Sequence, residues 1–310
     1  MNTGGSPVVK TLGLRKCYHT GLAGKSVTVL ESVDLTIYRG EIFGILGANG
    51  AGKSTTLKIL AGLIRPTDGQ AWLFDHPIDD PKIRARIGFL PDVPAFQDYL
   101  TAEESLMLSG RLAGLPPVLL RSRVGYVLST LGLSTVRQRR LAAFSKGMLQ
   151  RMGLAQALIH DPDLLLFDEP MSGLDPMGRA DVRDLILQLK QAGKTIIFSS
   201  HLLHDVELLC DRTGLLTSGR LVVQESRQEL QLASRSGPVD LVLEGLSEES
   251  LIELRCMSIA FFPDADRVLA TLPDSTYVDA ILDLVRRDNA RLVSLQPRAN
   301  LLEPLVGHVG

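Results

Sequence analysis

The 310 residues carry 33 basic and 35 acidic side chains, so the formal net charge is −2 and no basic excess indicates nucleic-acid binding. The length suits one large domain, or a main domain with a smaller companion. Three widely spaced cysteines without a C-x-x-C pair are typical of free thiols in a reducing cytoplasm. No apolar run reaches the roughly 18 residues that cross a bilayer, and Met1–Pro7 has no apolar signal core. If the chain serves a membrane process, we expect another chain to cross the membrane.

Alternating apolar residues over 8–15 and 27–38 predict two strands of an antiparallel hairpin. Tyr18 lies between them, in a segment that leads into a glycine-containing loop. The apolar run 42–46 then predicts a buried strand, and the pattern that begins near Thr55 predicts a helix. The stretch that joins this strand to this helix is the most informative one in the chain.

That stretch reads Gly47-Ala48-Asn49-Gly50-Ala51-Gly52-Lys53-Ser54, which has the phosphate-loop spacing G-x-x-x-x-G-K-[ST] between a strand and a helix. Its glycines allow tight backbone turns that bring N–H groups close to an anion. The start of the helix adds unpaired N–H groups and a positive dipole end. Lys53 supplies a full charge for the outer phosphates, and the Ser54 hydroxyl is a hard oxygen ligand for Mg²⁺. We therefore expect an NTPase that binds a nucleoside triphosphate with magnesium.

Strands over 70–75 and 86–92 follow, and the pattern then changes to helices. Thr101 and Glu104 have the capping-box spacing that opens a helix, and a Pro-Pro pair at 116–117 separates it from the next helix. We interpret about residues 93–143 as a helical insertion within an α/β core.

The core pattern resumes after this insertion, with a helix from Ser145 to about 159, a strand over 164–167, a helix over 177–192 and a strand over 195–200. The run 164–167 is apolar at every position, as expected for a parallel strand that is buried on both faces. The alternation of strands and helices predicts an α/β fold, with a mainly parallel sheet covered by helices as in P-loop NTPases.

The last eighty residues have a different character. A plausible linker lies over 233–238. Beyond it the patterns predict, in order, strand 239–243, helix 247–255, strands 258–262 and 267–271, helix 275–288 and strand 291–295. We expect a main domain over 1–232 and a small α+β module over 239–310, in which no motif indicates a function.

Two acidic residues, Asp168 and Glu169, directly follow the buried strand 164–167. The carboxyl ends of parallel strands line the ligand crevice of an open sheet, so we expect both acids to face the phosphate loop. Asp168 is then the expected magnesium partner, and Glu169 the general base for the water that attacks the γ-phosphate. His201 follows strand 195–200 at the same edge of the sheet, where it can hydrogen-bond the γ-phosphate or hold that water.

The stretch Phe144-Ser145-Lys146-Gly147-Met148-Leu149-Gln150-Arg151 opens a helix. Ser145 suits the N-cap position, and Gly147 leaves the following N–H groups open to an anion. Many helices begin with Ser-x-Gly, so this stretch gains its meaning only in combination with the others.

In that combination, the ordered segments GANGAGKS, FSKGMLQR, LLLFDEP, SGLDP and FSSH closely resemble the ATP-binding cassette of ABC transporters, over about residues 8–230. The resemblance implies that two cassettes pair head to tail, either two copies of this chain or this chain with a related ATPase. Each ATP, with its Mg²⁺, would lie between the phosphate loop of one cassette and the signature segment of the other. The resemblance also implies an integral membrane permease that binds the transported substrate. The chain would then be peripheral, on the cytoplasmic face of the inner (plasma) membrane.

The resemblance assigns a role to each matching residue. Tyr18 matches the aromatic residue that stacks on adenine. Ser145 and Gly147 match the signature positions that touch the γ-phosphate in the partner's site, and Asp175 matches a loop that communicates across the dimer. Glu169 is the expected catalytic base and His201 the switch histidine. The positions expected to hold the phosphates and magnesium are Gly47, Asn49, Gly50, Ala51, Gly52, Lys53, Ser54 and Thr55, with Asp168 as a further magnesium partner.

Two segments depart from the family pattern. The signature reads Phe-Ser-Lys-Gly-Met where the commonest form is Leu-Ser-Gly-Gly-Gln, although the two phosphate-touching positions are kept. Asp92 stands where the family usually has glutamine. Its carboxylate can reach Mg²⁺, and it also brings negative charge near the γ-phosphate.

Residues 90–100 and the helical insertion match the surface on which the family seats the permease, with Phe96 and Tyr99 as plausible contacts. The C-terminal module and the Ser-Lys-Gly-Met signature look most like the stand-alone ATPase subunits of export-type transporters. Two alternatives stay open at this stage: a soluble, non-transport ABC ATPase that acts on ribosomes or DNA, and a cytosolic metabolic or regulatory ATPase. A single cassette without sustained heptads favours the transporter.

Overall fold

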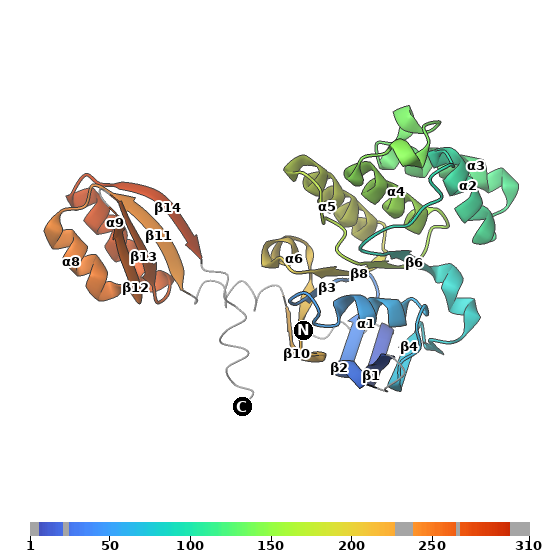
Figure 1. The fold of residues 1–310 in the computed structure, drawn as a ribbon, viewed down its shortest axis with the longest axis horizontal. Coiled ribbons are helices and arrows are strands. Elements are labelled where there is room, and N and C mark those ends of the chain that lie inside the picture. Colours follow the sequence, from blue (N-terminus) through green and yellow to red (C-terminus); the bar gives the residue numbers. More distant parts are fainter. Residues whose placement is uncertain (1–5, 21–24, 227–237, 265–266, 298–310) are drawn as a thin grey trace. The chain divides into compact units, whose positions relative to one another are not determined.

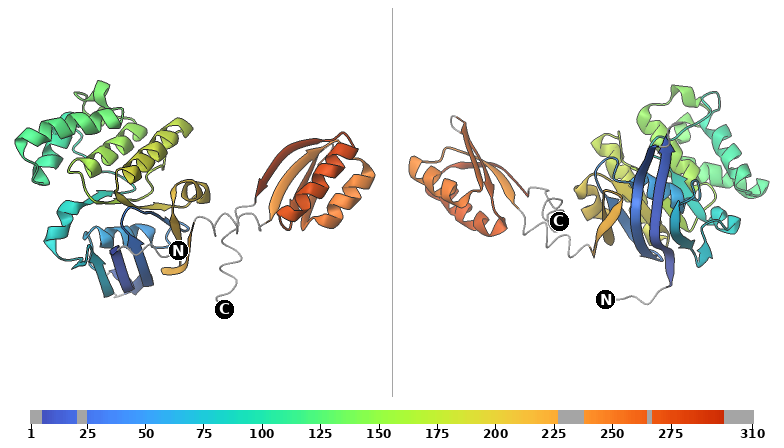
Figure 2. Two further views of the ribbon diagram at one scale, coloured as in Figure 1. Left: turned by 180° about the vertical axis from the view of Figure 1, so that it is seen from behind. Right: turned by 60° about the horizontal axis from the view of Figure 1, so that its bottom comes forward.

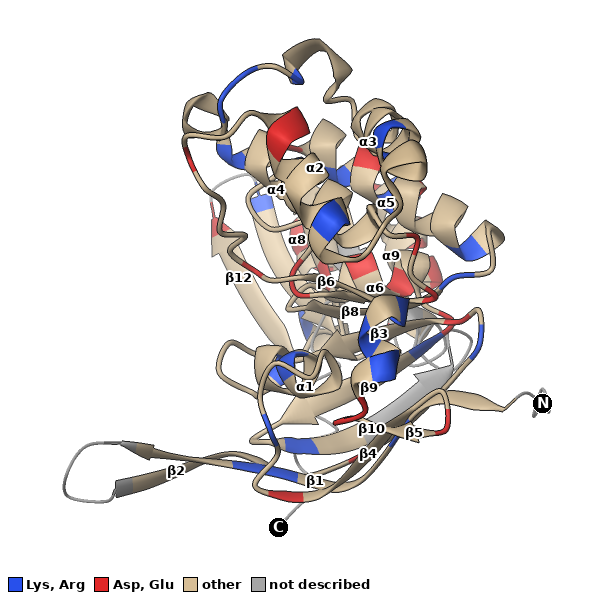
Figure 3. Cartoon of the chain, turned by 90° about the vertical axis from the view of Figure 1, so that its right-hand side faces the viewer, with Lys and Arg blue, Asp and Glu red and all other residues tan. Residues whose placement is uncertain are grey.

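The computed structural model describes residues 6–20, 25–226, 238–264 and 267–297, in two compact units, Met1–Gln224 and Glu225–Gly310 (Figure 1). Most of the predicted linker over 233–238 falls outside the described residues. Within them, no helix combines the length and apolar character that a membrane span needs. Lys and Arg are interspersed with Asp and Glu along the helices and strands (Figure 3), as the near-neutral composition suggests.

The first unit is built on a ten-stranded sheet in the order β5-β4-β1-β2-β10-β9-β3-β8-β7-β6. Its strands are β1 (Pro7–Thr20), β2 (Lys25–Tyr38), β3 (Ile42–Leu46), β4 (Asp68–Leu73), β5 (His76–Pro77), β6 (Ile87–Leu90), β7 (Leu164–Phe167), β8 (Thr195–Ser200), β9 (Arg212–Thr217) and β10 (Arg220–Ser226). The strands β1, β2, β4 and β5 pair antiparallel, whereas β3 pairs in parallel with β8 and β9, and β7 with β6 and β8. The predicted hairpin and the predicted parallel core are both confirmed.

The hairpin is longer than its sequence pattern predicted. β1 continues to Thr20, so Tyr18 lies within the strand, opposite Val27 of β2, rather than between the strands. The β-branched residues at the start of β2 provide cross-strand partners for this extension, which the polar character of Lys16 and His19 concealed.

The helices of the first unit are α1 (Lys53–Leu60), α2 (Ala102–Leu112), α3 (Pro117–Thr130), α4 (Lys146–Leu158), α5 (Pro176–Gln191) and α6 (Leu203–Leu209). Helices α2 and α3 occupy the predicted insertion and pack on each other and on α4. The capping box is present: the Thr101 hydroxyl accepts from Glu104 N at 3.2 Å, and the Glu104 carboxylate accepts from Thr101 N at 2.9 Å.

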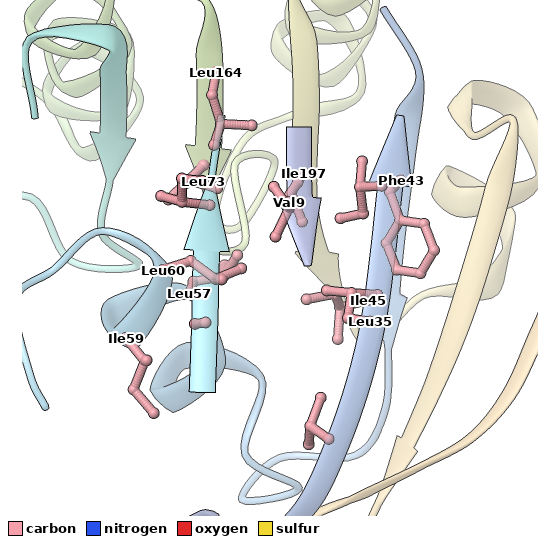
Figure 4. Packing of buried hydrophobic residues seen from close by; sticks show 14 of the residues in the cluster. Val9, Leu35, Phe43, Ile45, Leu57, Ile59, Leu60, Leu73, Leu164 and Ile197 are labelled. Atoms are coloured by element: carbon pink, nitrogen blue, oxygen red, sulfur yellow. The ribbon is translucent and has the colours of Figure 1, made fainter. Parts of the chain in front are cut away.

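One apolar core anchors the phosphate-loop helix to the sheet (Figure 4). Leu57, Ile59 and Leu60 of α1 are fully buried in it, together with Ile45 of β3 and Leu73 of β4. Burying a leucine or isoleucine stabilises the fold by about 1.5–3 kcal/mol. The helix that begins at Lys53 is therefore firmly seated where β3 ends.

The second unit has the element order β11 (Val239–Glu244), α8 (Glu248–Met257), β12 (Ala260–Asp264), β13 (Arg267–Leu272), α9 (Val278–Arg287) and β14 (Arg291–Pro297). Its four strands form one antiparallel sheet in the order β12-β13-β11-β14. This is the β-α-β-β-α-β arrangement of the ferredoxin-like fold. The apolar alternation of β11 supplies Val239, Leu241 and Leu243 to a core shared with α8 and α9.

Candidate functional site

The phosphate loop lies between buried β3 and α1, at the carboxyl end of the parallel strands. Gly50 and Gly52 have φ angles of 84° and 109°, a backbone region open to glycine and costly for other residues. A Cβ at Gly47 would collide with the backbone O of Leu216. Glycine is therefore required at these positions by the turn itself and by its close packing.

Lys53 is 5% exposed and lies under this loop. Its ammonium donates to the backbone O of Gly47 at 2.8 Å and of Ala48 at 3.3 Å. The same Nζ lies 3.3 Å from Oε1 of Glu169. The lysine thus joins the phosphate loop to the acidic pair that follows β7.

Asp168 and Glu169 are held by the neighbouring strand β8. The Ser199 hydroxyl donates to Oδ1 of Asp168 at 2.7 Å and accepts from the backbone N of Glu169 at 2.9 Å. Asp168 is 1% exposed. Ser199 thereby fixes both acids relative to β8, and no sequence signal singled it out beyond its place at a strand end.

Glu169 is the centre of the cluster. Its φ of 49° is in the left-handed region, which is uncommon for a non-glycine residue and is often found at functional sites. One carboxylate oxygen faces Lys53, and the other lies 2.9 Å from Nδ1 of His201. Oε1 is buried and makes no hydrogen bond of good geometry, so the ion pair with Lys53 is its polar contact.

Gln150 of α4 lies beside this cluster, and no sequence pattern assigned it a role. It is 4% exposed, and its amide donates to the backbone O of Pro170 at 3.0 Å and of Glu169 at 3.5 Å. This side chain ties α4 to the strained backbone that carries Glu169. Because glutamine is mostly exposed in proteins, a glutamine in an otherwise apolar helix face was the signal that could have found it.

A second cluster contains Ser145, Gly147 and Asp175. Ser145 caps α4 by accepting from Met148 N at 3.3 Å, and Asp175 caps α5 by accepting from Gly178 N at 2.8 Å. All three line one open hollow of about 550 Å³, together with Lys146 and Leu174. None of the phosphate-loop residues lines this hollow.

The remaining predicted residues lie outside both clusters or form the rest of the loop. Ala51 is buried, Asn49 and Gly50 are exposed, and Ser54 and Thr55 of α1 are half-buried. Tyr18 is 37% exposed on β1, with the ammonium of Lys16 5.0 Å from its ring centre. Asp92 is exposed, two residues after β6, and makes no hydrogen bond or ion pair with the described residues.

The phosphate loop and the cluster around Glu169 together fit a magnesium–triphosphate ligand. The Ser54 hydroxyl and the buried Asp168 carboxylate are hard oxygen donors of the kind that Mg²⁺ takes. A glycine-lined turn that side chains would obstruct, with a buried lysine beneath it, suits the close approach of phosphate oxygens.

Comparison with known proteins identifies the family. The family model described as "ABC transporter" matches residues 30–172. An uncharacterised ABC transporter ATP-binding protein of Synechocystis is 40% identical, over 96% of this chain and 82% of its own length. The bacitracin transport ATP-binding protein BcrA of Bacillus licheniformis is 38% identical, over 74% of this chain and 73% of its own. The daunorubicin/doxorubicin resistance ATP-binding protein DrrA of Streptomyces peucetius is 34% identical, over 78% and 72%.

Solved structures agree with these matches. A dimeric ATP-binding cassette in a post-hydrolysis state, bound to ADP and phosphate, superposes with a TM-score of 0.66. It is 27% identical and covers 71% of this chain and 98% of that one. The resemblance inferred from the motifs is confirmed, and the chain belongs to the ATP-binding proteins of ABC transporters, as the ATP-hydrolysing subunit.

Proposed function

We propose that two copies of this chain, or this chain and a relative, close head to tail on two ATP molecules and drive a separate membrane permease that exports its substrate. The observation that carries the proposal is the division of the site within one chain. Lys53 and Glu169 belong to one cluster, whereas Ser145 and Gly147 line a hollow to which the phosphate loop does not contribute. A second copy can supply the missing half to each, and a cassette to which the chain is similar is dimeric.

In the proposed reaction, Glu169 accepts a proton from the water whose oxygen attacks the γ-phosphorus. The bond from that phosphorus to the bridging oxygen breaks, and ADP and phosphate are formed. Mg²⁺, which Ser54 and Asp168 would hold, supplies positive charge to the phosphate oxygens. Lys53 adds a second positive charge, and His201 holds the Glu169 carboxylate from the side opposite to Lys53.

Ser145 and Gly147 take part in this reaction from the other copy. The N-terminus of α4 carries unpaired backbone N–H groups and a positive dipole end, which favour contact with a γ-phosphate. Gly147 lines the hollow beside Leu174, and a Cβ there would make van der Waals contact with Leu174 Cδ2 at 3.4 Å. Tyr18, exposed on the β1–β2 hairpin, is proposed to stack on the adenine ring.

The proposed seat of the permease is the segment between β6 and α2. Val93 and Tyr99 are 78% and 70% exposed there, whereas Phe96 is half-buried. Exposed apolar side chains that are this close in sequence favour a protein-binding surface. This seat would hold the chain on the cytoplasmic face of the membrane. The names of BcrA and DrrA, a transport and a resistance protein, support export as the direction.

The test is co-purification from detergent-solubilised membranes of cells that produce the chain with its native genetic neighbours. We expect a polytopic membrane protein to accompany the parent chain, and to be lost when Val93 and Tyr99 are both changed to Glu while ATP hydrolysis by the free subunit is retained. Recovery of ribosomes or DNA in place of a membrane protein would contradict the proposal. Export is tested by resistance of these cells to added bacitracin or daunorubicin, compared with cells that carry Glu169→Gln.

A further inference from the structure

The sheet of the second unit has one face that its own helices leave open. Val239, Leu241 and Leu243 of β11 point to the core beneath α8 and α9, which lie together on one side of the sheet (Figure 2). Because side chains alternate along a strand, Val242 and Glu244 point to the other side. We call this other side of the four-stranded sheet the open face.

Strand pairing arranges the open face in rows across the four strands, with a register shift in β14 between the two rows that leaves Val293, 42% exposed, unpaired. The first row, from β12 to β14, is Asp264, Arg267, Glu244 and Arg291. The neighbouring row, in the same strand order, is Phe262, Leu269, Val242 and Ser294. The charges of the first row alternate in sign, and the second row is apolar except at its end.

The apolar row is exposed to a degree that suggests a partner. Phe262 is 62% exposed and Leu269 46% exposed, side by side on adjacent strands. Arg267 and Glu244 next to them form an ion pair on the same face. An apolar strip flanked by charges is the composition of a protein-binding surface.

We propose that the open face packs against the open face of a second copy of this chain, about a two-fold axis parallel to the strands. Such an axis keeps each row opposite the same row and reverses the order of the strands. Asp264 then faces the second copy's arginine at position 291, and Arg267 faces its glutamate at position 244. In the apolar row, the large Phe262 faces a small serine, and Leu269 faces a valine.

A two-fold axis that runs across the strands is less favourable. It would place the charged row opposite the row on the far side of the apolar strip, which contains Asp240 paired with Thr271. Glu244 would then face an aspartate, and like charges in contact are destabilising. Charge complementarity therefore selects the parallel axis, since either axis keeps the strands of the two sheets aligned, as stacked sheets commonly are.

The size of the face predicts how strong this pairing is. Four strands of this length give a flat area of roughly 350 Å² per copy, against about 800 Å² per partner in a typical stable interface. The modules should pair weakly by themselves, and more strongly when the cassettes already hold two copies together. The pairing goes beyond the proposed function, because it does not depend on ATP.

The test uses the full chain with Lys53→Ala, in which the ATP-driven closure of the cassettes is removed. Sedimentation velocity without nucleotide, at concentrations up to about 100 µM, should show reversible dimers, because an interface of this size predicts weak association. Asp264→Arg or Arg291→Asp should each weaken the dimer about tenfold. The two-fold axis creates two contacts between positions 264 and 291, and each change places like charges at both of them. A mixture of the two variants should recover the parent's dimer, because both charge pairs are then complementary again.

That recovery also shows that both variant chains are folded. The proposal is overturned if the parent chain stays monomeric, if the single variants dimerise like the parent, or if the mixture gains nothing over either variant alone. Co-purification of a polytopic membrane protein with the chain that keeps Lys53 tests the proposed function independently of these outcomes.

The geometry is tested by disulfide formation between Phe262→Cys in one chain and Ser294→Cys in another, with Cys17 and Cys256 changed to Ser. Each chain carries only one of the two new cysteines, so a disulfide between positions 262 and 294 joins two chains. We expect the mixture to cross-link at least several-fold faster than either variant alone. Equal rates would exclude the two-fold axis proposed.

Discussion

Nζ of Lys53 lies 3.3 Å from Oε1 of Glu169, and the two side chains are only 6% and 15% exposed. The ion pair connects the phosphate loop after β3 with the acids after β7, two strands that are separated by β8. Because His201 contacts the other carboxylate oxygen, Glu169 is held between the first residue of α1 and the residue that follows β8, and it cannot turn freely. We infer that the base is positioned before catalysis, and the predictions for Glu169 and Gln150 depend on that arrangement.

Glu169→Gln should retain ATP binding but lose nearly all hydrolysis. The amide has the shape of the carboxylate and cannot accept the proton, and loss of a general base typically costs 10²–10⁴-fold in rate. Phosphate release measures the turnover, and size-exclusion chromatography with ATP and Mg²⁺ should show an accumulated dimer. Glu103→Gln removes a carboxylate from α2, far along the chain, and should hydrolyse ATP like the parent. Parental turnover in the Glu169 variant would exclude this residue as the base.

Gln150→Leu should lower kcat for ATP hydrolysis while the KM for ATP changes little. The change leaves the backbone O of Pro170 without its donor, at a cost of about 1–3 kcal/mol in stability, whereas the backbone O of Glu169 still accepts from Ser172 N. Gln156→Leu on the same helix is a matched control, because that glutamine is exposed and its side chain bonds only Ser109 among the described residues. A Gln150 variant with an unchanged kcat would show that this side chain does not position the base.

Asp92→Gln should retain hydrolysis. Asp92 is exposed and makes no polar contact with the described residues, so the structure gives no reason for a carboxylate in particular at this position. Steady-state ATPase rates of the two chains over a range of Mg²⁺ concentrations provide the measurement. If turnover disappears in the variant, the carboxylate itself is required.

His160 should make the fold less stable as the pH falls below about 6.5, the ordinary pKa of histidine. Burial lowers the pKa of His160, whose Nε2 donates to the backbone O of Ile87 at 3.0 Å. The unfolded chain therefore takes up a proton in the window below 6.5 where the folded chain does not, and stability is lost there. His160→Gln keeps a donor and does not titrate, so its melting temperature should fall less between pH 7 and pH 5.5. Identical pH profiles for the two chains would contradict this role.

The sequence predicted most of this fold because its signals are local. The phosphate loop, the capping box at Thr101 and the apolar run over 164–167 each depend on neighbours in the chain, and the elements of the C-terminal module were placed to within a few residues. The extension of β1 through Tyr18 was not predicted, because it depends on pairing with β2 rather than on alternation within β1.

The residues expected to take part in the chemistry were predicted from the sequence, whereas the residues that hold them in place were not. Strand ends placed Glu169 and His201 at one edge of the sheet, and the structure shows them in contact. Ser199 and Gln150 were not assigned roles, because a hydroxyl or an amide gains its function from distant backbone groups that only the folded chain brings close. The open face of the second unit could not be predicted for the same reason. Its row of alternating charges is created by the register between strands.

The shared ATP site is tested most directly by mixing two inactive chains. Lys53→Ala prevents the phosphate loop of one copy from binding ATP, and Ser145→Arg blocks the signature segment of the other. If two copies pair head to tail, the mixed dimer keeps one complete site, and hydrolysis should rise toward about one quarter of the parent's rate. If the mixture hydrolyses ATP no faster than the two variants measured separately, the nucleotide is not shared between Lys53 of one copy and Ser145 of another.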